Sequence, residues 1–351
     1  MSVRPGNRGI RAVVIGAGLM GARRAFSLAQ LPDVAVHWIC DPDAGRGNNL
    51  AARVSELQDA PCRWLPSQNL VDRSAEVVDL AVVAVPHDLA ASIACDFLDS
   101  GIHTFVEKPM GRDLGEASRL VTAAESSKAT LAVGFNYRHY PAVQHAKALI
   151  NQGYLGSIRL TRMIMGHGAR PGYEQEWKAQ RLHSGGGVLL DPGIHLIDLA
   201  RFLVGAMTPV QALTARVFWP LDVEDVAQVV LRSESEALVS IQTSLVDWRN
   251  RFSVELIGDE GYVKIDGRMG TYGPQTLTMG KRWAWLKCGS QVESETTEYF
   301  GDRDTSYDVE ISTLVAALKH GESLPADHQD GLAAMRLVSE LYTLAGSSVV
   351  P

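Results

Sequence analysis

Two kinds of segment alternate over the first 134 residues of the chain. Short apolar runs rich in Val, Ile, Leu and Ala have the pattern of strands that are covered on both faces of a parallel sheet. These runs are residues 12–15, 34–40, 77–85, 104–106 and 130–133. Amphipathic stretches of helical spacing separate them, at residues 19–30, 43–58, 88–100 and 113–127. The alternation predicts a doubly wound α/β sheet.

After residue 135 the pattern changes to longer strands of alternating polarity with turn residues between them. We expect these strands near residues 157–165, 226–231, 237–243, 252–256 and 262–265. Helices are predicted at 141–152, 191–203, 307–320 and 329–346. A polar and aromatic stretch without periodicity, 166–184, leads into the glycine run 185–187. Consecutive hairpins predict an α+β domain with an open, largely antiparallel sheet.

The two patterns divide the chain into two expected domains, residues 1–134 and residues 135–351. A length of 351 residues suits two domains better than one or three. An open sheet needs its second face covered, and four tryptophans are distributed over this half of the chain. They are Trp219, Trp248, Trp283 and Trp285. We therefore expect a homodimer or homotetramer formed through the sheet of the second domain.

The composition excludes several classes of protein. Hydrophobic residues make up 46% of the chain and charged residues 21%, which indicates neither a disordered chain nor a membrane span. The 33 Lys and Arg against 40 Asp and Glu leave a net charge of −7, so nucleic acid and membrane surfaces are poor partners. The scattered cysteines predict reduced thiols in a cytoplasmic chain, with no metal site. They are Cys40, Cys62, Cys95 and Cys288.

A glycine-rich turn follows the first predicted strand. Gly16-Ala17-Gly18-Leu19-Met20-Gly21 fits G-x-G-x-x-G and opens a helix, so its backbone can approach a pyrophosphate at a helix N-terminus. Asp41 lies 20 residues after Gly21, at the end of the second strand, where a carboxylate can bind ribose hydroxyls and repel a 2′-phosphate. The pattern favours NAD, while Arg46 nearby leaves NADP open. The alternative for Asp41 is an ordinary turn residue before Pro42.

Two further strands of the parallel sheet end in residues that can face a cofactor. Val85-Pro86 ends one and Glu107-Lys108-Pro109 ends another, at the carboxyl edge where open α/β sheets bind ligands. The Lys108-Pro109 bond is a candidate cis peptide, which would fix the direction of the lysine. The alternative for Lys108 is a solvent-exposed lysine in an ordinary turn.

The glycine run 185–187 leads to Asp191 and His195, which stand four residues apart and would share one face of a helix. Asp191 has two compatible interpretations. It can be the N-cap of a helix with Pro192 at its first position, or a pocket carboxylate that orients His195. His195 is either a buried core histidine or a catalytic residue. Asp198, one turn later, is expected to be a structural hydrogen-bonding residue.

These motifs together resemble the glucose–fructose oxidoreductase/inositol dehydrogenase/MocA (Gfo/Idh/MocA) family. The segments that carry the resemblance are 16–21, 107–109, 134–138 and 185–198, and the later hairpins and terminal helices resemble the second domain of that family. One position departs from the family pattern. A histidine is frequent four residues after the proline that ends the strand, and this chain has Ala90 there. No role is carried over to that position.

The resemblance implies an oxidoreductase that transfers hydride between a nicotinamide cofactor and a hydroxyl-bearing carbon of a sugar, sugar derivative or cyclic polyol. It implies that His195 is the general base, that Lys108 supports the developing alkoxide, and that Asp191 lines the site with them. Glu107 would hold the nicotinamide ribose or position Lys108. The cofactor-binding set is then Gly16, Gly18, Leu19, Met20, Gly21, Asp41, Val85, Pro86, Glu107 and Lys108.

The resemblance also implies a substrate site that includes Arg138, Asp191 and His195, and residues 166–184 are expected to carry much of its specificity. Trp177 is suited to stacking on a sugar ring, or else is a loop residue pinned on the core. The basic and aromatic residues of this stretch suggest an anionic substituent on the substrate. They are His167, Arg170, Tyr173, Trp177, Lys178, Arg181 and His183, against Glu174 and Glu176.

Two other functional classes stay open at this point. Some relatives use tightly held NAD to cleave a glycoside, and net production of NADH separates that reaction from a dehydrogenase. A non-enzymatic NAD-responsive regulator on the same fold is the third class. The presence of Lys108, Asp191 and His195 together argues against it, because a sensor needs none of them.

Overall fold

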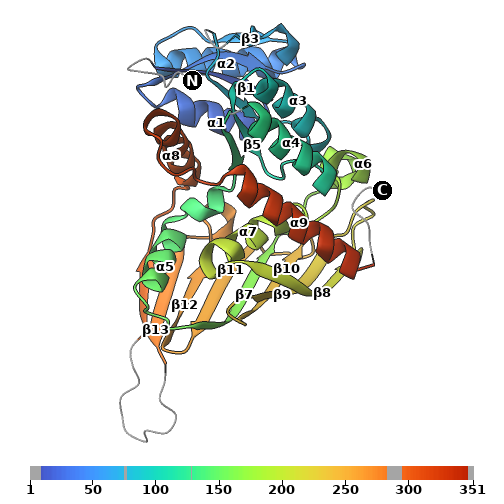
Figure 1. Cartoon of the computed structure of the whole chain (residues 1–351). Helices are drawn as coiled ribbons and strands as arrows, with labels where there is room; N and C mark the ends of the chain where they lie inside the picture. The colour runs from blue at the N-terminus through green and yellow to red at the C-terminus, as the bar shows by residue number, and fades with distance from the viewer. Residues whose placement is uncertain (1–8, 75–76, 128, 283–294, 347–351) are drawn as a thin grey trace, which may run out of the picture. The chain divides into compact units, whose positions relative to one another are not determined.

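The computed structural model describes residues 9–74, 77–127, 129–282 and 295–346, and the chain forms two compact units (Figure 1). The first unit runs to Asn136 and also takes Leu182–Gly185 and Tyr307–Met335. The second unit takes Tyr137–Arg181, Gly186–Ser306 and the chain from Arg336 onward. Each unit is built on its own sheet.

The first unit is a six-stranded parallel sheet in the order β3-β2-β1-β4-β5-β6, the strand order of a Rossmann fold. Its strands are β1 Ile10–Ile15, β2 Val34–Cys40, β3 Arg63–Leu65, β4 Leu80–Val83, β5 His103–Glu107 and β6 Leu131–Gly134. Its helices include α1 Leu19–Ala29, α2 Ala44–Gln58, α3 His87–Asp99, α4 Leu114–Ser127 and α8 Ser306–His320. The prediction of a doubly wound parallel sheet is confirmed.

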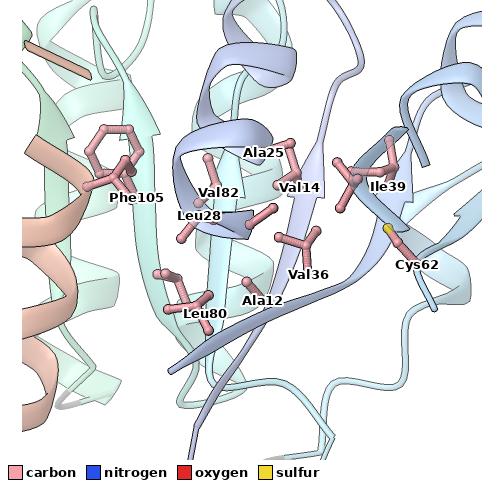
Figure 2. Packing of buried hydrophobic residues seen from close by; sticks show 14 of the residues in the cluster. Ala12, Val14, Ala25, Leu28, Val36, Ile39, Cys62, Leu80, Val82 and Phe105 are labelled. Carbon is pink, nitrogen blue, oxygen red and sulfur yellow. The ribbon is translucent and has the colours of Figure 1, made fainter. Parts of the chain in front are cut away.

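A hydrophobic core lies between this sheet and α1 (Figure 2). Alternate residues of neighbouring strands enter it, such as Val14 of β1 and Val82 of β4, and Leu28 of α1 packs on them with no exposed surface. Full burial of a side chain of this size contributes about 1.5–3 kcal/mol. Helix α8 adds Ile311 and Leu314 to the same core. A helix near the end of the chain therefore completes the first unit.

The second unit is an eight-stranded sheet in the order β14-β13-β12-β11-β7-β10-β9-β8. Its strands are β7 Ile158–Gly166, β8 Met207–Ala215, β9 Val226–Ser233, β10 Leu238–Ser244, β11 Arg251–Gly258, β12 Gly261–Asp266, β13 Thr276–Lys281 and β14 Thr296–Tyr299. All pairs are antiparallel except β7 with β10. The expected largely antiparallel sheet is confirmed, with one parallel pair at its centre.

Helices cover one face of the second sheet. Helix α5 (Pro141–Asn151) packs on β12 and β13, and α7 (Gly193–Val204) packs on β7 and β10. The short elements η3 Tyr173–Gln175, η4 Trp177–Ala179 and α6 Arg181–Ser184 precede α7, and α9 His328–Leu344 is the last helix of the described chain. Along β11, Phe252 and Val254 alternate with residues of the other face and are buried. This two-residue alternation of buried and more exposed side chains is typical of a strand in a sheet with one covered face.

The tryptophans expected on the open sheet differ in their surroundings. The Nε1 of Trp219 donates to the carbonyl of Leu245 over 2.8 Å, whereas Trp248 is 66% exposed with its ring edge-on to the exposed Phe218. Trp283 and Trp285 lie outside the described residues. The subunit contact through this sheet stays a prediction.

Other features expected from composition can be placed in the described part of the chain. Cys40, Cys62 and Cys95 are free thiols, and burial raises the pKa of both Cys40 and Cys62 to about 12, whereas Cys288 lies outside the described residues. Within the same ranges, no three or more His, Cys, Asp or Glu side chains are grouped so that they could hold a metal ion. None of the described helices has both the length and the apolar character that crossing a membrane requires.

Candidate active site

The glycine turn of the first unit has the geometry that a dinucleotide needs. Gly16 has φ +97°, and a Cβ there would lie 2.2 Å from the carbonyl oxygen of Ala84. A Cβ at Gly21 would lie 1.8 Å from the oxygen of Gly16, so only glycine allows the helix this close to the strand. At Gly18 nothing lies within 4 Å of the Cβ position, and no side chain caps α1. The space beside Gly18 and the absence of a side-chain cap suit the binding of a pyrophosphate by the N-terminal amides of α1.

Asp41 connects the end of β2 to this turn. Its Oδ2 accepts from the amide of Ala17 over 2.7 Å, and its Oδ1 accepts from the amide of Asp43 and from Arg46 Nη2 over 2.8 and 3.1 Å. The carboxylate is thus both a turn residue and a neighbour of the glycine turn, so the two interpretations of Asp41 are compatible. Its place beside the turn fits recognition of the cofactor ribose.

Trp64 and Gly47 support this position, and sequence reasoning identified neither. The Nε1 of Trp64 on β3 donates to the carbonyl of Asp41 over 2.8 Å. A Cβ at Gly47, inside α2, would lie 2.1 Å from Cδ1 of Trp64. A glycine inside a predicted helix is the one signal that pointed to a close packing contact here.

The other predicted cofactor residues lie at the ends of β4 and β5. Val85 and Pro86 connect β4 to α3, and Pro86 is the residue before the first turn of that helix. Glu107 is the last residue of β5, with a side chain 12% exposed, and its Oε1 accepts from Arg24 Nε over 2.6 Å. The Lys108-Pro109 peptide is cis, as predicted. The glycine turn, Asp41 and these strand ends all belong to the first unit, and they fit a dinucleotide.

In the second unit, His195 lies in an aromatic cluster. Its ring stacks on that of Tyr137 with centroids 4.0 Å apart and an angle of 7° between the planes. The Tyr137 ring contacts Phe252 edge-on at 5.6 Å, and its hydroxyl donates to Sδ of Met165 over 3.3 Å. His195 is 7% exposed. The imidazole is therefore held in one orientation by packing, with a small part of its surface accessible.

The prediction that Asp191 is the N-cap of the following helix is wrong. Helix α7 begins at Gly193, Pro192 occupies the N-cap position, and no side chain caps the helix. Asp191 Oδ2 instead accepts from Lys178 Nζ over 2.6 Å. The ammonium of Lys178 carries a full positive charge that a backbone amide lacks, so this hydrogen bond joins two ions.

The Lys178–Asp191 pair has three neighbours from the stretch that was expected to govern specificity. The charge of Asp191 holds the pKa of Lys178 above its ordinary value, and Lys178 Nζ lies 5.6 Å from the ring centroid of Trp177. Burial first, and then the charge of Asp191, raise the pKa of Tyr173 to about 12. Burial first, and then the charge of Arg268, lower the pKa of His167. This stretch therefore places an amine in contact with Asp191, and a phenol and an imidazole within range of its charge.

The basic excess of residues 166–184 is matched inside the chain. Arg170 pairs with Glu176 at 2.7 Å, and Lys178 pairs with Asp191. In the first unit, His183 Nδ1 lies 2.7 Å from Oδ2 of Asp88. The charge count that suggested an anionic substituent on the substrate therefore carries less weight, because Arg170, Lys178 and His183 each have a carboxylate partner.

Arg138 and Asp198 form a buried bidentate pair. Nε and Nη2 of Arg138 donate to the two carboxylate oxygens of Asp198 over 2.8 and 2.5 Å, and the guanidinium lies 5.3 Å from the ring centroid of Phe202. Asp198 is thus the structural hydrogen-bonding residue that was expected. The same pairing gives Arg138 a structural role beside the substrate role that the resemblance implies.

A buried carboxylate holds the glycine run in the second unit, and sequence reasoning missed it. Glu224 is 5% exposed and accepts from the amides of Gly187 and Leu189, each over 3.0 Å. The hydroxyl of Tyr342, on α9, donates to the same carboxylate over 2.6 Å. A Cβ at Gly187 would lie 2.1 Å from the carbonyl oxygen of Glu224. The glycine run is therefore required by close backbone packing just before Asp191.

Two family models match the chain. The NAD-binding Rossmann fold of an oxidoreductase family matches residues 10–135, and the GFO/IDH/MocA C-terminal domain matches residues 143–264. The fold, the glycine turn and the two matched domains define an NAD-binding oxidoreductase of two domains. The chain belongs to the Gfo/Idh/MocA family, as the sequence motifs indicated.

Individual relatives agree with this assignment. The chain is 27% identical over 284 residues to levoglucosan dehydrogenase of Pseudarthrobacter phenanthrenivorans, covering 71% of this chain and 72% of the relative. It is 25% identical to myo-inositol 2-dehydrogenase of Thermotoga maritima, covering 93% and 94% of the two chains. Among solved structures, GenD2 from gentamicin A biosynthesis in complex with NAD is 25% identical, with a TM-score of 0.80 over 97% of this chain and 95% of that one.

Proposed function

We propose that the protein is an NAD-dependent dehydrogenase that oxidises a hydroxyl-bearing carbon of a sugar, a sugar derivative or a cyclic polyol. The observation that carries this proposal is the stacked His195 of the second unit, four residues after Asp191, which pairs with Lys178. The first unit of the same chain has the glycine turn of an NAD-binding fold. The relatives named above are dehydrogenases of a sugar derivative and of a cyclic polyol.

The first unit would hold the cofactor through its backbone and two carboxylates. The amides at the start of α1 would bind the pyrophosphate, Asp41 the adenosine ribose, and Glu107 the nicotinamide ribose. When bound, NAD⁺ supplies the acceptor for the hydride. The cofactor-binding residues Val85, Pro86 and Lys108 complete the proposed set.

His195 is the proposed general base. Stacking on Tyr137 holds the ring in one plane, so that a ring nitrogen can accept the proton of a substrate hydroxyl without reorientation. Asp191 and Lys178 are proposed to bind neighbouring hydroxyls of the substrate, because each presents hydrogen-bonding atoms and Lys178 has a side chain that is 39% exposed. Trp177, next to Lys178, is proposed as the stacking surface for the sugar ring.

Lys108 is the proposed cation that stabilises the alkoxide as the proton leaves. Preorganised positive charge acts where negative charge develops, and this is usually the largest contribution to such a step. The chain therefore has a proton acceptor in His195 and an electrostatic stabiliser in Lys108. The names of the relatives reported above support a dehydrogenase and lend no support to the glycoside hydrolase or regulator alternatives.

The proposal is tested by following NADH absorbance with a panel of cyclitols, free sugars, sugar phosphates and nucleotide sugars. His195→Ala is expected to lower kcat by about 10²–10⁴-fold on the substrate that is turned over, the range of general base catalysis. His320→Ala, at an exposed position at the end of α8, is the matched control and should retain full activity. A loss under tenfold for His195→Ala would transfer the role of base to Lys108.

The oligomer and its location are part of the same proposal. The open face of the second sheet is proposed to form a homodimer or homotetramer, and the protein is proposed to work in the cytoplasm. Size-exclusion chromatography at micromolar concentration is expected to show at least a dimer. A monomer at that concentration would refute the subunit contact.

A further inference from the structure

A buried charge cluster joins three elements of the first unit. Arg24, on α1 and three residues after Gly21, is fully buried. Its Nε donates to Oε1 of Glu107, at the end of β5, over 2.6 Å. Its Nη1 forms an ion pair with Oε2 of Glu310, on α8, at 2.6 Å, and Glu310 is also fully buried. One guanidinium therefore links the helix of the glycine turn, the strand that ends in Glu107-Lys108, and a helix near the end of the chain.

The cluster is closely packed on its remaining sides. Cζ of Arg24 lies 4.6 Å from the ring centroid of Phe105, which is labelled on β5 in Figure 2, and 4.9 Å from that of Tyr307. Gly134 pairs with Glu107 across β5 and β6, and a Cβ there would lie 3.0 Å from Arg24 Nη2, from Glu107 Oε2 and from Phe105 Cζ. The carboxylate of Glu107 therefore has little freedom to change its rotamer.

The electrostatics of the cluster agree with this geometry. Burial by itself lowers the pKa of Arg24, but the charges of Glu107 and Glu310 outweigh that effect and hold the pKa above its ordinary value. Arg24 is therefore a cation at any working pH. Buried ionic groups of this kind add little net stability compared with apolar packing, because each must leave water. Their contribution here is the fixing of one arrangement around Glu107.

We propose that Arg24 and Glu310 are positioning residues for Glu107 and, through it, for the cofactor and Lys108. This inference rests on the proposed function, in which Glu107 holds the nicotinamide ribose or positions Lys108. Arg24 fixes the direction of the Glu107 carboxylate, and Glu310 holds the other side of the guanidinium so that Arg24 cannot turn away. Glu310 stands 203 residues after Glu107 and lies outside the segments 16–21, 107–109, 134–138 and 185–198.

The competing explanation is that the cluster only fastens α8 to α1. A matched pair of variants separates the two. Glu310→Gln removes the charge that restrains Arg24. Ser27→Ala removes another contact between the same two helices, the hydrogen bond from Ser27 Oγ to Oδ1 of Asp308 at 2.6 Å, without touching Glu107. The affinity for NAD⁺ is measured by calorimetry, the melting temperature by circular dichroism, and kcat and KM on the substrate that the panel identifies.

We expect both variants to lower the melting temperature, and only Glu310→Gln to raise the Kd for NAD⁺, by about 2- to 30-fold, the usual range for coupling between residues that do not touch the ligand. Placed in a Glu107→Gln background, Glu310→Gln should add less than about a twofold further change, because its effect passes through Glu107. The proposal is overturned if Ser27→Ala shifts the Kd equally, if Glu310→Gln leaves the Kd unchanged, or if its effect persists without the Glu107 carboxylate.

A replacement variant and the behaviour of the wild-type protein distinguish failure of this inference from failure to fold and from failure of the proposed function. If Glu310→Gln does not fold, Arg24→Lys replaces it, because one ammonium cannot reproduce both fixed contacts of the guanidinium, and the same criteria apply. The Kd for NAD⁺ needs no turnover. A wild-type protein that binds NAD⁺ but oxidises nothing in the panel refutes the proposed substrate class. The positioning role of Arg24 and Glu310 is then decided by the Kd values for NAD⁺ alone. A wild-type protein that does not bind NAD⁺ refutes both.

Discussion

Replacing Tyr342 by phenylalanine removes one hydroxyl from the interior of the second unit and is expected to lower its stability by about 1.5–3 kcal/mol, the range for a hydrogen bond to a charged group. The hydroxyl donates to Glu224 over 2.6 Å, and the two residues are 1% and 5% exposed. The ring packing is unchanged by the substitution. The carboxylate keeps the amides of Gly187 and Leu189 but loses its shortest hydrogen bond.

This loss should not depend on pH near neutrality. Burial first, and then the charge of Glu224, hold the pKa of Tyr342 well above its ordinary value, so the hydroxyl keeps its proton. The difference between Tyr342→Phe and the wild type should therefore be the same at about pH 7 and pH 9, both below the unperturbed tyrosine pKa of about 10. A difference that shrinks over this interval would mean that the hydroxyl ionises.

Thermal unfolding followed by circular dichroism measures the effect. For a unit of this size, about 2–4 °C accompany each kcal/mol, so the melting temperature should fall by roughly 3–12 °C. Tyr299→Phe is the matched control, because Tyr299 is 75% exposed on β14, and its change should stay within about 0.5 kcal/mol. If Tyr342→Phe is as stable as this control, the Glu224 network does not contribute as described.

Three further predictions follow from single contacts. Asp41→Ala should raise the Kd for NAD⁺ at least about tenfold and that for NADP⁺ much less, because a carboxylate repels a 2′-phosphate; equal changes in two calorimetric titrations would contradict this. His103 Nδ1 accepts from the amide of Thr130 over 3.0 Å, and burial lowers the pKa of His103 in the folded state. The contribution of His103 to stability is therefore fully present at and above the unfolded pKa of about 6.5. It is lost as the pH falls from there toward the lower pKa of the folded state. His103→Asn keeps an acceptor and should flatten this dependence in urea unfolding between about pH 7 and 5, whereas an unchanged slope would assign it elsewhere. Gly187→Ala would place a Cβ 2.1 Å from the oxygen of Glu224 and should cost roughly 1–3 kcal/mol, so a melting temperature equal to that of the wild type would show that the glycine run can move freely.

Much of the fold could be predicted because its signals are local. Nearly continuous apolar runs marked β1, β2, β4, β5 and β6. The strand expected at 77–85 is the shorter β4, Leu80–Val83. The three residues of β3 were missed, because Arg63–Leu65 is too short to show a period. The alternation in β8 is weak, since most of that strand is exposed. Strand length limited the prediction of β3, and the small difference in burial between the two faces limited that of β8.

The cofactor half of the candidate site was predictable from local sequence, whereas the surroundings of Asp191 were not. The glycine turn is a backbone motif, and its spacing to Asp41 is set by one strand–helix–strand unit, so both could be read from the chain. The preference of Asp191 for an N-cap was also a local signal, and it was wrong. Lys178, 13 residues earlier, binds the carboxylate once the intervening loop folds back. A local preference of about 1 kcal/mol does not decide against a charged partner supplied by tertiary contact.

The sequence by itself determined the order of the elements, the parallel and antiparallel sheets, the glycine turn with Asp41, and the family. Each depends on residues close in the chain, where apolar period and turn chemistry act. Only the tertiary structure decided that Arg24 pairs with Glu107 and Glu310, and that Glu224 and Tyr342 hold the glycine run. Buried charges take whichever partner the packing of distant elements brings within reach, because no solvent is there to replace it. The identity of such a partner produces no hydrophobic period or motif spacing in the sequence from which it could be predicted.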